Sequence, residues 1–235
     1  MKNKDIIIIQ ARLSSSRVNQ KMINKIDDNT IIEWVIRRLS YINCLKIVCL
    51  PFNDIDSKLH KIISKYLSKN LLIDFGEQEN VYLRVLDILS RKNIDIDSNL
   101  IRVCADRPFI EPILVKNLSD SFNDKNSLLF NHISYKEFFI PRGFGAEIFS
   151  YRLFKELYSN NISDYHKEHM TSLIWDNETI KKNHKFPEQY IFKKYINLNT
   201  DYDVDTIEDL EKIKKLIVKH SLSFKNSFLY EKAIR

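Results

Sequence analysis

Residues 6–21 read IIIIQARLSSSRVNQK, and this stretch decides the fold. Four consecutive isoleucines and a glutamine form a short apolar run, which is typical of a central parallel strand buried on both faces. The residues that follow are polar and cationic, so they predict a loop at the carboxyl end of that strand. Ligands of open α/β sheets bind at this edge.

Outward from this strand, apolar runs alternate with segments of helical periodicity. Strands are predicted at residues 45–50, 71–75, 100–104 and 127–131, and helices at 31–39, 59–67, 81–89 and 113–122. This alternation predicts βαβ units and a mostly parallel sheet with right-handed crossovers. An aromatic stretch at 132–150 interrupts it and predicts an antiparallel hairpin or insertion. Beyond it we expect helices at 151–159 and 164–175, a strand at 190–198 and a last helix at 206–219.

The 235 residues suit one α/β domain, expected at residues 1–220, with 132–175 as an extension and 221–235 as a tail that docks or frays. The net charge of +6 is spread along the chain, which is typical of a lysine-rich solvated surface, although it also suits attraction to an anionic small molecule. No RNA-recognition signature, signal peptide or membrane span is found, so we expect a cytoplasmic protein without nucleic-acid or membrane partners.

The chain has only three glycines, Gly76, Gly143 and Gly145. None of them lies in the loop directly after the first strand. This excludes the glycine-rich dinucleotide and Walker A loops, which need glycine at that point. If the first loop holds phosphates, side chains must supply more of the donors. Arg12, Arg17 and Lys21 suit this task because guanidinium and ammonium groups match phosphate oxygens. A merely solvated loop is the alternative.

Two carboxylates follow predicted elements at opposite ends of the chain. Asp106 comes directly after the strand at 100–104, where it could hold Mg²⁺ or serve in a turn before Pro108. Asp205 with Glu208 predicts a capping box that opens the last helix, a role compatible with metal binding. We expect the two carboxylates to lie close enough to share one Mg²⁺, well within about 10 Å, since Mg–O bonds are about 2.1 Å long.

Five segments in order resemble the cytidylyltransferases that make CMP-activated acidic sugars, the acylneuraminate and 3-deoxy-manno-octulosonate enzymes, and particularly the branch named for spore-coat polysaccharide synthesis. The family patterns IIQARxxSxRLPxK, RxxGDxPL, PxGxxxEVF, REHxT and VDTPEDL are similar to residues 8–21, 102–109, 141–149, 167–171 and 204–210. The resemblance covers about residues 5–217.

The resemblance implies a three-layer nucleotide-diphospho-sugar transferase fold, which is Rossmann-like, with a small antiparallel dimerisation extension, and a Mg²⁺-dependent transfer of CMP from CTP to a sugar acid or related metabolite. The catalytic residues it implies are Arg12, Lys21, Asp106 and Asp205, the last two holding the metal. The nucleotide-binding residues it implies are Gln10, Ala11, Arg12, Ser14, Arg17, Lys21, Arg84, Arg102 and Asp106. The acceptor-binding residues it implies are Arg142, Gly143, Glu147, Glu168 and His169.

The chain departs from these patterns at several positions. Val18-Asn19-Gln20 stands where the family has Leu-Pro-Gly, and Ala105 and Gly145 replace a glycine and an aspartate. Two other functions therefore stay open. A glycosyltransferase would use a DxD, which Asp203-Val204-Asp205 fits, and a non-catalytic nucleotide-binding protein would tolerate the altered loop.

Aromatic residues gather in the segment that interrupts the alternation, at 135–139 and at Phe144, Phe149 and Tyr151. Aromatic side chains are enriched at interface cores, and two-fold dimers are the commonest oligomers. We therefore expect a homodimer built through this segment, with packing of these residues onto their own sheet as the alternative.

Overall fold

Strand β1 lies between β2 and β4 inside a seven-stranded sheet with the order β3-β2-β1-β4-β6-β5-β7. The computed structural model describes residues 4–14, 17–123, 128–130, 140–159, 161–184 and 191–230. The strands of this sheet are β1 Asp5–Gln10, β2 Leu45–Pro51, β3 Leu71–Gly76, β4 Asn99–Cys104, β5 Leu128–Phe130, β6 Glu147–Ser150 and β7 Lys182–His184.

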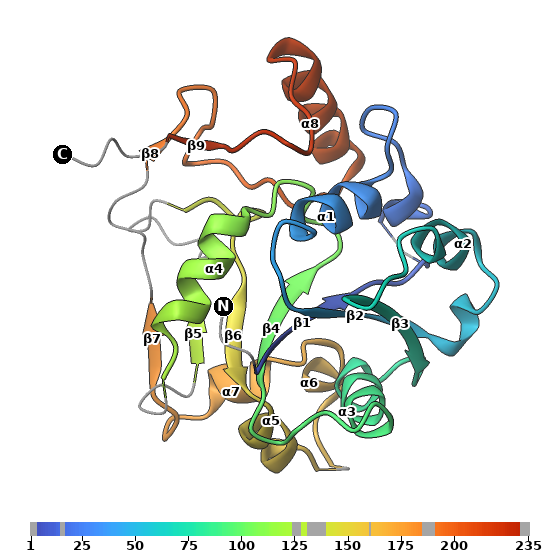
Figure 1. Cartoon of the computed structure of the whole chain (residues 1–235), viewed down its shortest axis with the longest axis vertical. Helices are drawn as coiled ribbons and strands as arrows, with labels where there is room; N and C mark the ends of the chain where they lie inside the picture. The colour runs from blue at the N-terminus through green and yellow to red at the C-terminus, as the bar shows by residue number, and fades with distance from the viewer. Residues whose placement is uncertain are drawn as a thin grey trace.

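Helices cover both faces of the sheet, which gives three layers (Figure 1). Ile7 and Ile9 of β1 face one hydrophobic cluster together with helices α1, α2 and α4, whereas Ile6 and Ile8 face another with α3, α5 and α7. This period of two, with both sets buried, is what a central strand requires. The helical segments are η1 Lys21–Ile23, α1 Ile31–Leu39, η2 Phe52–Asp54, α2 Lys58–Ser64, α3 Val81–Arg91, α4 Pro112–Ser121, α5 Tyr151–Leu157, α6 Asp164–Glu168, α7 Ser172–Asp176 and α8 Ile207–Lys219.

The predicted α/β fold with a mostly parallel sheet is confirmed. β1 pairs in parallel with β2 and β4, β2 with β3, and β5 with β7. Among the described strands of this sheet, β6 is the one that runs antiparallel to its neighbours, β4 and β5. Among the described residues, the antiparallel strand β6 is internal to the main sheet, and a second antiparallel pair lies outside it, between β8 Ile191–Phe192 and β9 Leu229–Tyr230.

The later elements differ from the predictions in several places, and no strand was predicted at β7 Lys182–His184 or at Leu229–Tyr230. The prediction of a strand at 190–198 is wrong beyond Phe192, where β8 Ile191–Phe192 ends. The chain turns there, because the Ile196 amide donates to the Lys193 carbonyl. The helix expected at 164–175 is divided into α6 and α7. The Ser172 amide donates to the His169 carbonyl at 2.7 Å and reverses the chain between them.

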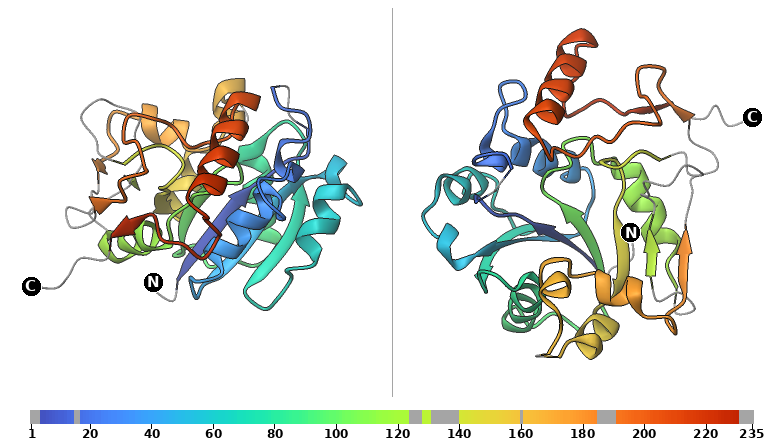
Figure 2. Two further views of the ribbon diagram at one scale, coloured as in Figure 1. Left: turned by 90° about the horizontal axis from the view of Figure 1, so that it is seen from above. Right: turned by 180° about the vertical axis from the view of Figure 1, so that it is seen from behind.

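A third hydrophobic cluster joins α8 and the C-terminal segment to α1. Figures 1 and 2 show α8 beside α1, at the edge where the sheet strands end. Phe228 is fully buried there, with its ring 4.4 Å from that of Phe109. Strand β9, Leu229–Tyr230, pairs with β8. Of the two outcomes expected for the tail, docking is the one found for residues 221–230.

Three of the aromatic residues expected at a dimer interface are buried inside their own chain. Phe144 and Phe149 are fully buried and Tyr151 is 3% exposed, because all three pack in the hydrophobic clusters of this sheet. Their expected role at an interface is therefore wrong. Residues 135–139 lie outside the described part of the chain. Within the described part, no helix combines the length and the apolar character needed to cross a membrane.

Candidate active site

A cavity of about 520 Å³ opens at the carboxyl ends of β1 and β4. These two strand ends are neighbours because Gln10 and Cys104 are partners in the parallel register. Gly143 is the one predicted site residue that does not line this cavity. The predicted residues that do line it are Gln10, Ala11, Arg12, Ser14, Arg17, Lys21, Arg84, Arg102, Asp106, Arg142, Glu147, Glu168, His169 and Asp205.

A backbone connection brings the two predicted metal-binding carboxylates together. The Val204 amide donates to the Asp106 carbonyl at 2.9 Å, so the segment before α8 lies against the loop after β4. The predicted capping box of Asp205 is wrong by one residue. Thr206 is the N-cap of α8, and its side chain and that of Asp209 form the reciprocal pair. Because Thr206 caps the helix, the Asp205 carboxylate is left to face the cavity.

Lys21 joins these carboxylates through its ammonium group. Its Nζ lies 2.9 Å from Asp106 Oδ2 and 3.2 Å from Asp205 Oδ1, and its side chain is 9% exposed. Burial alone would lower the pKa of Lys21, but the two carboxylates more than offset it and raise that pKa. The oxygens cannot be farther apart than the sum of the two distances, so the expected closeness of Asp106 and Asp205 is confirmed.

This carboxylate pair fits a hard divalent cation. Mg²⁺ is commonly held by one or two carboxylates, with phosphate and water oxygens completing its shell. The Lys21 ammonium already occupies a position between the two carboxylates, as a cationic counter-ion would. Among the described residues there is no group of three or more His, Cys, Asp or Glu side chains that could bind a metal by themselves. A metal at this place would therefore depend on oxygens from a ligand or from water.

Asp203 also belongs to this site, although its sequence predicted a role for it only in the DxD of the alternative glycosyltransferase function. Its side chain is 5% exposed and lies 3.3 Å from Arg107 Nε and 2.7 Å from Arg142 Nη2. Arg107 also donates to the Gly145 carbonyl at 3.0 Å. Burial opposes the charge of Arg107, but Asp203 is the largest of the contributions that raise its pKa. The first carboxylate of the DxD-like segment therefore binds arginines, which disfavours the glycosyltransferase interpretation.

Three arginine side chains at the rim pair with carboxylates and remain partly exposed. Arg17 and Arg142 lie 3.6 and 3.7 Å from the Asp205 carboxylate, and Arg12 lies 3.2 Å from Glu168. Such pairs contribute little to stability because water screens them. The guanidinium groups of Arg12 and Arg17 can therefore exchange a carboxylate for another anion at small cost, whereas Arg142 is also held by the buried Asp203.

Arg102 and Glu147 were predicted on different sides of the site, but the sheet makes them neighbours. They are register partners on β4 and β6, and Arg102 Nη1 donates to Glu147 Oε2 at 3.0 Å. Arg102 Nε also donates to Gln10 Oε1 at 2.5 Å, and Trp175 donates its indole N–H to Glu147 at 3.4 Å. Sequence analysis missed Trp175, since nothing in its local sequence indicates a polar contact.

Two predicted binding residues have clear backbone roles. Arg84 is 2% exposed and donates to the carbonyls of Glu77 and Gln78 at 2.7 and 2.6 Å, which holds the loop after β3. Gly143 has a φ of +100°, and a Cβ there would lie 2.6 Å from the Tyr202 carbonyl carbon. The absence of a side chain at Gly143 thus lets the segment before Asp203 approach the site.

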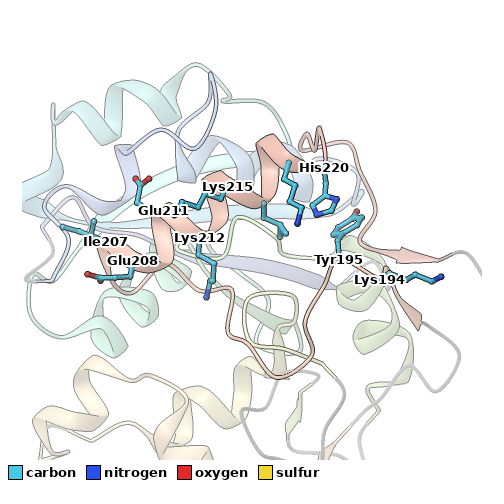
Figure 3. Close-up of a pocket in the computed structure, with 10 residues that line it drawn as sticks. Lys194, Tyr195, Ile207, Glu208, Glu211, Lys212, Lys215 and His220 are labelled. Atoms are coloured by element: carbon cyan, nitrogen blue, oxygen red, sulfur yellow. The ribbon is translucent and has the colours of Figure 1, made fainter.

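A larger cavity of about 980 Å³ lies along α8 (Figure 3). Lysine and glutamate side chains from successive turns of that helix line it, together with the stacked rings of Tyr195 and His220, whose centroids are 4.6 Å apart. It contains none of the predicted site residues. Alternating charges on one helix face are typical of a solvated surface, so the smaller cavity is the candidate active site.

Comparison with known proteins identifies the family of the chain. The cytidylyltransferase family model matches residues 6–234. A solved cytidylyltransferase structure from Leptospira borgpetersenii superposes with a TM-score of 0.81 at 26% identity, over 96% of this chain and 90% of that chain. A solved CMP:2-keto-3-deoxy-manno-octonic acid synthetase complexed with CTP shares the fold, with a TM-score of 0.60 at 16% identity over 92% of this chain and 99% of that one.

One protein that is related by sequence is the 3-deoxy-manno-octulosonate cytidylyltransferase of Rickettsia bellii. It is 31% identical over 132 residues, which are 55% of this chain and 52% of that protein. The alignment thus spans about half of the relative, whereas the family model spans nearly the whole of this chain. The chain belongs to the cytidylyltransferase family of nucleotidyltransferases.

Proposed function

We propose that the protein transfers CMP from CTP to a small sugar acid or related metabolite and releases pyrophosphate, with Mg²⁺ as its cofactor, for surface glycan synthesis in the cytoplasm. One observation carries this proposal. A buried ammonium bridges two carboxylates at the carboxyl edge of the sheet, inside a cavity rimmed by arginines. Phosphoryl transfer depends mainly on positioning and on charge neutralisation, and this arrangement supplies both.

The cations have separate tasks in this proposal. Arg12 and Arg17 bind the triphosphate, since their guanidinium groups are exposed and their present ion pairs are easily exchanged. Lys21 is buried and already oriented by Asp106 and Asp205, so it neutralises charge that develops on the transferred phosphoryl group without moving far. The acceptor oxygen attacks the α-phosphorus in line, and pyrophosphate leaves.

Asp106 and Asp205 would hold Mg²⁺. The ion, when bound, neutralises phosphate charge and orients the phosphate oxygens. The backbone bond between Val204 and Asp106 keeps the two carboxylates in register for this task.

The acceptor is assigned to the side of the cavity formed by Arg142, Glu147 and His169. Arg142 is anchored by Asp203 and keeps 35% of its side chain exposed, which suits recognition of a carboxylate. The relative from Rickettsia bellii is named for an acceptor that is a sugar acid, which supports this class of substrate. A homodimer remains part of the proposal, and light scattering at micromolar concentration would test it.

Pyrophosphate release tests the reaction. The purified protein is incubated with Mg²⁺, each of the four nucleoside triphosphates in turn, and pools of keto-sugar acids or phosphorylated metabolites. We expect release that requires CTP and a sugar acid together, and that the Asp106→Asn variant loses. Consumption of a nucleotide sugar without pyrophosphate release from any triphosphate would instead indicate a glycosyltransferase.

A further inference from the structure

A separate cavity of about 470 Å³ lies at the amino-terminal edge of β2 and β3, opposite the candidate active site. Lys46 of β2, which lines it, is the register partner of Ile7 in β1, whereas Gln10 at the far end of β1 lines the candidate active site. About 10 Å of extended strand therefore separates the two levels of the sheet. The walls come from the end of α1, the loop before β2, the turn before β3 and the C-terminal segment.

Lys46 is the one buried cation among the residues that line this cavity. It is 4% exposed, and its Nζ donates to the carbonyls of Ile42 and Cys44 at 2.6 and 2.9 Å. An ammonium group has three N–H donors, and these two carbonyls use two of them. Within the described ranges, no carboxylate forms an ion pair with Lys46, in contrast to Lys21 in the candidate active site.

A buried cation without a carboxylate is costly, because neutral carbonyls replace only part of its hydration. Burial lowers the pKa of Lys46, as expected when the charged form lacks an anionic partner. An anion entering the cavity would remove this cost. Among the described residues that line the cavity there is no Asp or Glu side chain that would repel one.

The rest of the wall suits a compact anion. Arg37 lines the cavity with its guanidinium 4.6 Å from the Phe224 ring and 5.6 Å from the Tyr66 ring, and it donates to the Tyr66 hydroxyl. That hydroxyl in turn donates to Glu33, which does not line the cavity. Hydroxyl and amide donors in the wall are Ser40, Asn43, Ser68 and Asn70. We propose that this cavity is a second binding site, for the phosphate or carboxylate group of a small metabolite, with Lys46 as its central ligand.

Amide chemical shifts can test this site directly. The ¹⁵N-labelled protein is titrated with inorganic phosphate and, separately, with acetate, at constant ionic strength. We expect saturable shifts at the amides of Ile42, Cys44 and Asn70, and the probe that binds more tightly identifies the kind of oxyanion. Phosphate shifts around Lys21 report the candidate active site and are read separately, so a failure of the proposed function would not affect this result.

Variants decide whether Lys46 carries the binding. Lys46→Met should weaken the saturable binding at these amides at least ten-fold, while Lys61→Met, at an exposed position on α2, should leave it unchanged. Arg37→Gln, at a half-buried position, should weaken it as well and provides the test if Lys46→Met does not fold. The proposal is overturned if neither probe gives saturable shifts at these amides, or if the cavity variants bind as tightly as the unmodified protein.

Discussion

Two groups of ion pairs in this molecule, Arg38 with Glu111 and Lys21 with Asp106 and Asp205, differ in exposure. Arg38 and Glu111, 2% and 3% exposed, form a pair beneath the C-terminal segment. Arg38 also donates to the carbonyls of Ile110, Phe224 and Asn226. In the candidate active site, by contrast, the carboxylates that share Lys21 are 21% and 28% exposed.

This difference separates a structural role from a binding role. The donors of Arg38 are used inside the protein, and Glu111 also accepts from the Phe228 amide at 3.1 Å, so this pair anchors the tail. A buried pair of this kind is expensive to break, although it adds little compared with an apolar core. The active-site carboxylates are partly exposed to the cavity, and the rim arginines that pair with them can exchange a carboxylate for a phosphate. Exposure, more than ion pairing itself, marks the candidate active site.

The largest effect is expected from Asp106→Asn. Loss of this charge should lower kcat by about 10³-fold or more, equivalent to about 4 kcal/mol, because Lys21 and the proposed Mg²⁺ would both lose a partner. The melting temperature should change little, since the carboxylate is partly solvated. Asp97→Asn, in an exposed pair with Arg152, is the matched control and should leave both quantities unchanged. Full activity of Asp106→Asn would show that the partly exposed carboxylates have no more part in catalysis than the buried Arg38–Glu111 pair.

Arg38→Met is expected to lower the stability of the fold and to leave catalysis unchanged. It leaves the Glu111 carboxylate buried without its cation, which should cost about 3–5 kcal/mol in the free energy of unfolding, measured in urea. Activity per folded molecule should be retained. Arg91→Met removes an arginine from the partly exposed pair with Asp74 and should cost about 1 kcal/mol or less. Equal losses in these two variants would contradict the assignment of Arg38 as the tail anchor.

Lys21→Ala should have a smaller effect on catalysis than the loss of Asp106. We expect a loss of about 2–4 kcal/mol in transition-state stabilisation, measured from kcat/KM, since one preorganised cation is removed. Lys25→Ala, at an exposed position close by in the sequence, should react at the normal rate. A normal rate in Lys21→Ala would show that the buried ammonium only balances the two carboxylates.

The smallest effect concerns the residue before Lys21. Gln20 has a φ of 50°, in the left-handed region, where the resembled family carries a glycine. Gln20→Gly should therefore raise the free energy of unfolding by about 1 kcal/mol, because glycine has no Cβ to strain that backbone. Gln78→Gly, at a position outside the left-handed region, should lower it. Destabilisation by both variants would mean that the loop tolerates glutamine without strain.

Much of the fold could be predicted because the relevant signals are local. The isoleucine run predicted the central strand, and its two-sided burial follows from the helices on both faces. The predictions failed where short segments respond to distant contacts. Residues 193–198 are apolar enough for a strand, but the Tyr202 hydroxyl accepts from the Asn197 amide at 2.8 Å in a turn beside α8.

The sequence by itself determined the order of the strands and helices from β1 to β5, the cationic loop after β1 and the two carboxylates whose motifs resemble the family. Periodicity and short motifs are sufficient for these features, since each depends on neighbours in the chain. Only the tertiary structure decided which charges meet. The Lys21–Asp205 and Arg102–Glu147 pairs join residues 184 and 45 positions apart. Such contacts follow from sheet register and from the backbone bond between Val204 and Asp106, which no local pattern encodes.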